Sequence, residues 1–111
     1  MSGVNLYIVL ASVLFASFGQ LFLKLGAMNM QHAKFFVNLW LLFGFLFYIM
    51  GAGLWIYVLS REDLIKVFPF TALTFIITYF FGYFMLGENV SKLDTLGILL
   101  IISGLMIIVK N

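Results

Sequence analysis

The sequence is poor in the residues on which soluble and redox-active proteins depend. Charged residues make up 9% of its 111 residues, whereas soluble domains average about 25%. Cysteine is absent, which excludes disulfides, thiol redox chemistry and thiolate metal sites. The single histidine, His32, has no partner ligand near it in the sequence, so we expect neither a metal site nor a cofactor. A net charge of +2 is too small to indicate a nucleic-acid partner.

Hydrophobic residues, by contrast, make up 65% of the chain and form four long segments. A helix that crosses a bilayer needs roughly 20 apolar residues, and the segments at residues 4–25, 35–59, 64–86 and 93–109 are close to that length. Helices satisfy their own backbone in lipid. The unbroken aliphatic run at 98–102 lacks the alternation of a membrane β-strand. We therefore predict an all-α membrane protein, one domain over residues 1–111, built as a four-helix transmembrane bundle.

Basic residues are divided equally between the two sides of this predicted bundle. Four spans place both termini on one side, and the positive-inside rule compares the lysine and arginine counts of the two sides. The terminal side has Arg61, Lys66 and Lys110, and the other side has Lys24, Lys34 and Lys92. The rule therefore gives no orientation, and both a single orientation and insertion in two orientations, as in an antiparallel dimer, remain open.

Polar residues follow one face of the first segment. Ser17, Gln20 and Lys24 are spaced i, i+3 and i+7, which places them on the same side of a helix. Polar groups at membrane depth are costly, so this face is a candidate substrate-binding surface. Alternatively, the serine and glutamine bond to neighbouring helices while the lysine extends to the membrane surface.

The third segment repeats this spacing with threonines. Thr71, Thr74 and Thr78 share a face, and Tyr79 follows the last of them, so we include all four as candidate substrate-binding residues. Threonine hydroxyls can instead bond back to their own helix. Pro69, in the same segment, removes one backbone donor and predicts a kink whose freed carbonyl needs another partner.

Small residues in the other segments predict close helix packing, because helices in lipid approach one another most closely where side chains are small. In the first and second segments these residues are Ser12, Ala16, Gly19, Gly44 and Gly51. In the fourth segment Gly97, Ser103 and Gly104 predict a packing or dimerisation surface.

Acidic residues occur only at the ends of the segments, as Glu62, Asp63, Glu88 and Asp94. A proton-coupled carrier usually holds an ionisable group at membrane depth, and the deepest one in this chain is Lys24. No nucleophile set, buried carboxylate pair or phosphate loop is evident, so we do not expect an enzyme.

Four motifs, in order and at similar spacing, resemble the small multidrug resistance family and its relatives in the drug/metabolite transporter superfamily. Residues 19–24 are similar to the Gly-Gln-Leu-x-x-Lys motif of the aminoarabinose lipid-carrier (undecaprenyl phosphate) flippase subunits. Residues 68–73 resemble their Tyr-Pro-Met stretch, and residues 87–91 resemble their Glu-Pro-Val-Ser turn, with Asn89 in place of the proline. Residues 97–104 resemble the glycine-containing dimerisation helix.

One position departs from the drug exporters of this family. They carry a membrane-embedded glutamate eight residues before the lysine that corresponds to Lys24, and Ala16 stands at that position. Alanine binds neither a proton nor a cation, so the resemblance does not imply drug/proton antiport. The flippase-like branch also lacks the glutamate.

The resemblance implies a transporter or flippase subunit that moves a polyprenyl-phosphate-linked sugar, or a related anionic lipid, across the bacterial inner membrane. The head group would meet Lys24 on one side, or Arg61 and Lys66 on the other, and the partners would be membrane lipid and a second or paralogous subunit. One alternative is an exporter of small cations or metabolites, in which Glu88 is either the coupling group or only a turn residue. Another is a non-transporting accessory subunit of a membrane enzyme.

Overall fold

The computed structural model describes residues 3–30 and 39–110, and within these ranges it contains helices and no strand. Four helical spans in the described chain are long and apolar enough to cross a membrane, which confirms the predicted fold class. The elements are α1 (Gly3–Met30), α2 (Leu39–Leu59), α3 (Leu64–Val67), η1 (Phe68–Phe70), α4 (Thr71–Phe80), η2 (Phe81–Met85) and α5 (Lys92–Lys110). His32, Lys34 and the predicted start of the second span at residue 35 lie outside the described residues.

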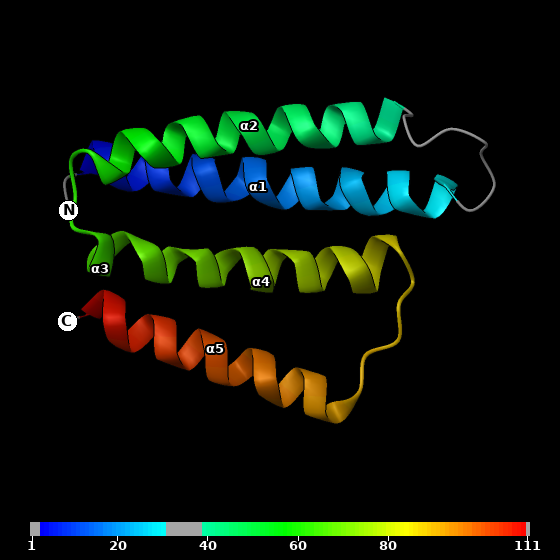
Figure 1. The fold of residues 1–111 in the computed structure, drawn as a ribbon. Helices are drawn as coiled ribbons and strands as arrows, with labels where there is room; N and C mark the ends of the chain where they lie inside the picture. The colour runs from blue at the N-terminus through cyan, green and yellow to red at the C-terminus, as the bar shows by residue number, and fades with distance from the viewer. Residues whose placement is uncertain (1–2, 31–38, 111) are drawn as a thin grey trace.

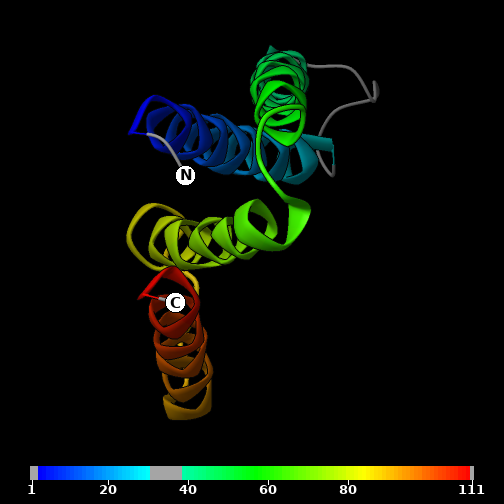
Figure 2. The same cartoon turned by 90° about the vertical axis from the view of Figure 1, so that its left-hand side faces the viewer.

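The spans lie in the order α2, α1, α4, α5 and form a thin arrangement measuring 48 × 35 × 16 Å. The first and last described residues, Gly3 and Lys110, lie at the same end of the molecule (Figure 1). In the end-on view, α4 lies between the α1–α2 pair and α5 (Figure 2). The described spans therefore do not close around one central core, and most side chains face outward, toward lipid in a membrane.

α1 and α2 approach each other closely because their facing residues are small. A Cβ added to Gly19 would lie 3.1 Å from the Gly44 carbonyl oxygen, and one added to Gly44 would lie 2.9 Å from the Leu23 nitrogen. Ser12 donates a hydrogen bond of 2.8 Å from its hydroxyl to the Gly51 carbonyl. The predicted close packing through these small residues is confirmed.

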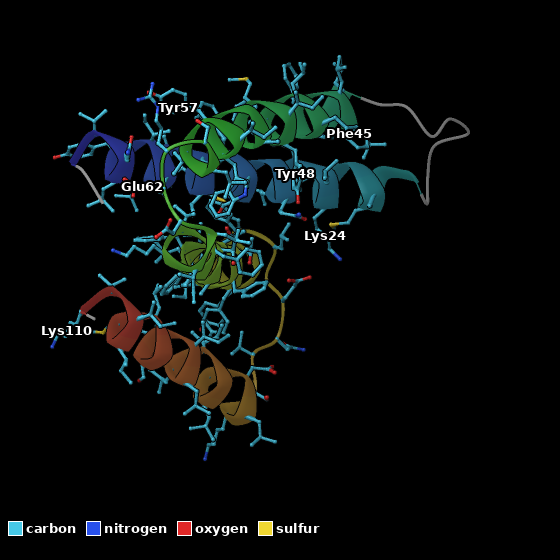
Figure 3. The ribbon with its side chains drawn as sticks, turned by 60° about the vertical axis from the view of Figure 1, so that its left-hand side comes forward. Lys24, Phe45, Tyr48, Tyr57, Glu62 and Lys110 are labelled. Carbon is cyan, nitrogen blue, oxygen red and sulfur yellow. The ribbon has the colours of Figure 1, made fainter. Side chains whose placement is uncertain are left out.

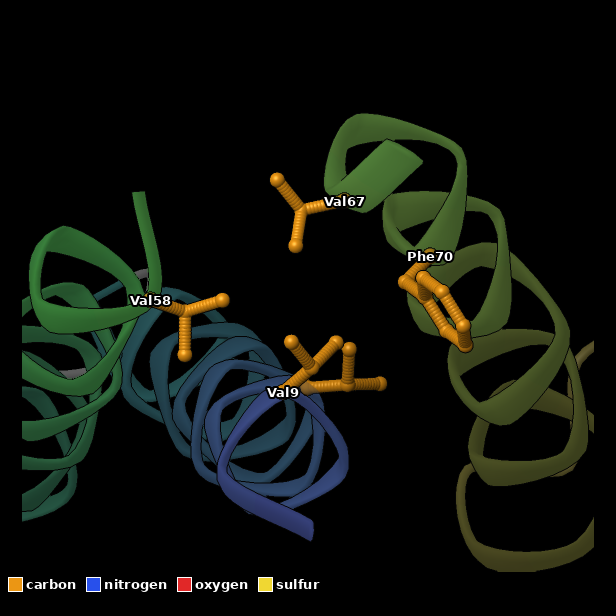
Figure 4. Packing of buried hydrophobic residues seen from close by; sticks show 5 residues of the cluster. Val9, Val58, Val67 and Phe70 are labelled. Carbon is orange, nitrogen blue, oxygen red and sulfur yellow. The ribbon is translucent and has the colours of Figure 1, made fainter. Parts of the chain in front are cut away.

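A small apolar cluster joins four elements at the end of the molecule that holds the termini. Val9 of α1, Val58 of α2, Val67 of α3 and Phe70 of η1 point toward one another (Figure 4). In lipid such contacts stabilise helix association mainly through van der Waals packing. The cluster fixes where the third span begins relative to α1, and so positions the rest of that span along α1.

The third span is not one continuous α-helix. Pro69 lies in the 3-10 turn η1, which interrupts the α-helix where the proline predicted a kink. The Thr71 hydroxyl donates a bond of 2.7 Å to the Phe68 carbonyl in this turn. Further along, η2 (Phe81–Met85) is π-helical, a feature that the sequence did not predict and that occurs frequently at functional sites.

α5 begins with two reciprocal capping hydrogen bonds and contacts α4 through a pair of hydroxyl groups. The Asp94 N–H donates to the Ser91 hydroxyl, and the Ser91 N–H donates to the Asp94 carboxylate, both at 3.1 Å. This is a capping box, which satisfies two N–H groups that the helix start would otherwise leave free. The Tyr79 and Thr95 hydroxyls, 3.2 Å apart, link α4 to α5.

Candidate substrate groove

A groove runs between α1 and α4. Its outer section, about 390 Å³, is lined by Gln20, Leu21, Lys24, Thr74, Phe75, Thr78, Phe81, Gly82, Leu86 and Glu88. Its inner section, about 340 Å³, is lined by Ser12, Val13, Ala16, Gln20, Tyr48, Gly51, Ala52, Trp55, Thr71, Thr74 and Phe75. The two sections share Gln20, Thr74 and Phe75, so we treat them as one α1–α4 groove.

Both predicted polar faces contribute to this groove. Gln20 and Lys24 line it from α1, and Thr71, Thr74 and Thr78 line it from α4. The Thr78 hydroxyl donates to the Thr74 carbonyl at 2.8 Å, so bonding back to the helix and facing the groove occur together. A hydroxyl that donates to its own helix still offers lone pairs to a ligand.

Ser17 does not line the groove, although its spacing placed it with Gln20 and Lys24. Its side chain is fully buried, and its hydroxyl donates to the Val13 carbonyl of the same helix at 2.8 Å. Buried hydroxyls need a hydrogen-bond partner, and Ser17 finds one without any ligand. Its position is that of a packing residue of α1.

Lys24 meets Glu88 at the outer end of the groove. The Lys24 ammonium lies 3.6 Å from a Glu88 carboxylate oxygen, and each side chain is 50% exposed. Figure 3 shows Lys24 far from Tyr57, Glu62 and Lys110, which lie at the opposite end of the molecule. Exposed ion pairs contribute about 0–1 kcal/mol, so another anion can replace Glu88 on Lys24 at small cost.

A hydrogen bond to η2 anchors the main chain of Glu88, and the absence of a side chain at Gly82 leaves room for the Glu88 carboxylate. Its N–H donates to the Gly82 carbonyl at 2.9 Å. Its carboxylate lies over Gly82, where an added Cβ would be 2.5 Å from Oε1. Gly87, directly before it, has φ +67°, a left-handed conformation that glycine adopts readily.

The remaining candidate residues lie elsewhere. Arg61 packs over the Tyr57 ring, 5.5 Å from its centroid, and Lys66 is exposed in α3, so neither lines the groove. Tyr79 lines a separate cavity of about 420 Å³ between α4 and α5, together with Gly97. The Ser103 hydroxyl donates to the Leu99 carbonyl at 2.9 Å, and an added Cβ at Gly104 would meet nothing within 4 Å.

The groove combines a cation, a carboxylate, an amide, hydroxyls and aromatic rings. Such a set suits a ligand with a charged head and polar substituents. Within residues 3–30 and 39–110 there is no group of three or more potential metal-ligating His, Cys, Asp or Glu residues. The charged and polar groups that line the groove can recognise a ligand by charge and hydrogen bonding.

Comparison with protein-family models matches residues 2–110 to the EamA-like transporter family. No match was found among curated proteins or among solved structures. The family match spans all the described helices, including α1, α2 and α4, which line the groove.

Proposed function

The chain belongs to the EamA-like transporter family, in the drug/metabolite transporter superfamily, and from this premise we propose its substrate. It is a multi-pass membrane protein and a transporter by family. We propose that it moves a polyprenyl-phosphate-linked sugar, or a related anionic lipid, across the bacterial inner membrane. The observation that carries this proposal is the position of Lys24 at the end of a groove lined by polar residues from two helices.

Each part of such a lipid has a matching surface. A phosphate pairs well with an ammonium group such as that of Lys24. Gln20 and Thr74, which line both sections of the groove, offer hydrogen-bonding groups to the hydroxyls of a sugar. The polyprenyl tail would stay in lipid, alongside the exposed apolar side chains of the spans.

The inner section of the groove favours this substrate over a cationic drug. Ala16 lines that section, and no carboxylate is among the described residues that line it. A cation there would find no opposite charge and no proton-binding group of the kind that antiport requires. The resemblance to the lipid-carrier flippase subunits supports the same choice.

Export of a small cation remains a second candidate because Glu88 lines the outer section and is half exposed. In that function Glu88 would bind the cation or the coupling proton. Glu88→Gln should then abolish transport, whereas unchanged transport by this variant would remove the candidate.

We also propose that the chain works as a homodimer or with a paralogous subunit. The thin arrangement leaves the groove without a helix from the described chain to close it. Gly104 has open space beside it on α5, where another helix could approach closely, whereas the space beside Gly97 is part of the cavity between α4 and α5. The mass of the detergent-solubilised protein would test this. A monomeric mass for a protein that binds the lipid would contradict the proposal.

An accessory subunit of a membrane enzyme would give a different result. It would co-purify stably with that enzyme and would not bind the lipid.

Ligand-dependent thermal stability tests the substrate. A ligand that binds only the folded state raises stability by mass action. We expect polyprenyl phosphate in detergent micelles to raise the unfolding temperature, and Lys24→Ala to reduce that shift. Lys92→Ala is the matched control because it removes the same charge at the start of α5, outside the groove lining. Stabilisation by a quaternary ammonium ion, but not by the phosphate lipid, would contradict the proposal.

A further inference from the structure

Glu88 lies between two cavities. It lines the α1–α4 groove and also the cavity between α4 and α5, and Thr78 and Gly82 line both as well. Its carboxylate is placed on the groove side, against Lys24. A carboxylate at this boundary has a second space beside it, the cavity between α4 and α5.

Gly82 is what lets the carboxylate reach its present position. Any Cβ at residue 82 would collide with Glu88 Oε1, at 2.5 Å. The neighbouring atom is the end of a flexible side chain, so a substitution there would displace the carboxylate and leave the helix backbone in place. The backbone bond from the Glu88 N–H to the Gly82 carbonyl, at 2.9 Å, anchors the main chain independently of the side chain.

From this geometry we infer that Glu88 is an internal anion that occupies Lys24 in the empty groove and yields it to the phosphate of the substrate. The inference rests on the proposed function and concerns the regulation of the same site. The Lys24–Glu88 pair is half exposed, and such pairs are weak. A phosphate brings more acceptor oxygens and forms stronger charge-assisted hydrogen bonds, so it displaces the carboxylate toward the α4–α5 cavity.

This exchange would serve release as well as selectivity. Because every bound anion must first displace Glu88, weakly binding anions are rejected. When the lipid leaves, the carboxylate returns to Lys24, so that the lysine does not remain unpaired at the membrane boundary. A transporter gains from this arrangement because its site must both bind and release the substrate.

Affinity measurements on two variants test the exchange. Glu88→Gln removes the competing charge at nearly constant size, and Gly82→Ala displaces the carboxylate while keeping its charge. Each should bind polyprenyl phosphate about two- to fivefold more tightly in detergent micelles. This change in dissociation constant corresponds to the free energy that an exposed ion pair contributes. Asp63→Asn removes a carboxylate from the other end of the molecule, and Gly53→Ala adds a Cβ that meets nothing within 4 Å. These controls should bind as the unchanged chain does.

A lipid-free measurement separates this inference from the proposed function. Labelling of Lys24 by an amine-reactive reagent, followed by mass spectrometry, should be faster in Glu88→Gln and Gly82→Ala than in their controls, because in the unchanged chain the Glu88 carboxylate lies against the Lys24 nitrogen and restricts the access of the reagent. Faster labelling together with tighter lipid binding would support the exchange. Lipid binding that is equal in Glu88→Gln and Asp63→Asn would overturn the exchange alone. Faster labelling without lipid binding by any variant would instead contradict the proposed function, and the exchange with it.

Discussion

Gly44→Ala should weaken the contact between α1 and α2. The new Cβ would lie 2.9 Å from the Leu23 backbone nitrogen and 2.8 Å from a methyl carbon of the same residue. Because the backbone of α1 cannot shift locally, the two helices must separate. Overpacking of this kind typically costs about 1–3 kcal/mol, while alanine gains about 1 kcal/mol over glycine in helix propensity.

Gly53→Ala isolates the packing contribution. It lies on the same helix, and its added Cβ would meet nothing within 4 Å. The propensity gain is common to both variants, so their difference in unfolding free energy should equal the overpacking cost, about 1–3 kcal/mol. Equilibrium unfolding in mixed micelles, followed by circular dichroism, measures both. Equal stability of the two variants would refute the close approach of α1 and α2 at Gly44.

Three further predictions concern single hydrogen bonds. Ser12→Ala should reduce the free energy of unfolding by about 0.6–2 kcal/mol in the same assay, because it removes the bond to the Gly51 carbonyl. Ser91→Ala should destabilise the start of α5 by about 1 kcal/mol, read as faster hydrogen exchange in its first turn, whereas Ser91→Asp should preserve the cap. Tyr79→Phe should loosen α5 from α4, seen as a broader distance distribution between spin labels on the two helices; an unchanged distribution would show that the link to Thr95 contributes nothing.

The spans were predictable because their composition leaves few alternatives. Long apolar runs separated by short polar breaks determine the number of helices and their approximate limits. The details at the ends were not predictable to the same degree: α1 continues to Met30, past the predicted end at residue 25. No proline lies in residues 26–30 to stop it, and Gly26 still packs closely against Leu41 of α2.

The third span shows what local sequence can and cannot reveal. Pro69 marked the interruption at η1, because a missing N–H has a local effect. No local pattern in the sequence indicates that residues 81–85 form the π-helical η2. The cap of α5 could have been found from the sequence, since Ser91 and Asp94 have the spacing of a capping box.

The candidate site was predicted in part. Helical spacing correctly grouped Gln20 with Lys24 and the three threonines with one another, but it could not say which residues of each group face the groove. Ser17 satisfies its hydroxyl inside α1 instead. The Lys24–Glu88 pair joins residues far apart in the sequence. The sequence placed Lys24 and Glu88 on the same side of the membrane, and this was its only indication that the two residues could form a pair.

Transport by the purified chain reconstituted in vesicles tests the central claim most directly. The measurement is the rate at which a fluorescent polyprenyl-phosphate-linked sugar crosses the bilayer, with Lys24→Ala compared against Lys92→Ala. We predict that the unchanged chain and Lys92→Ala move the lipid, and that Lys24→Ala, folded by circular dichroism, loses most of this activity. Equal transport by Lys24→Ala and Lys92→Ala would contradict the assignment of Lys24 as the head-group site.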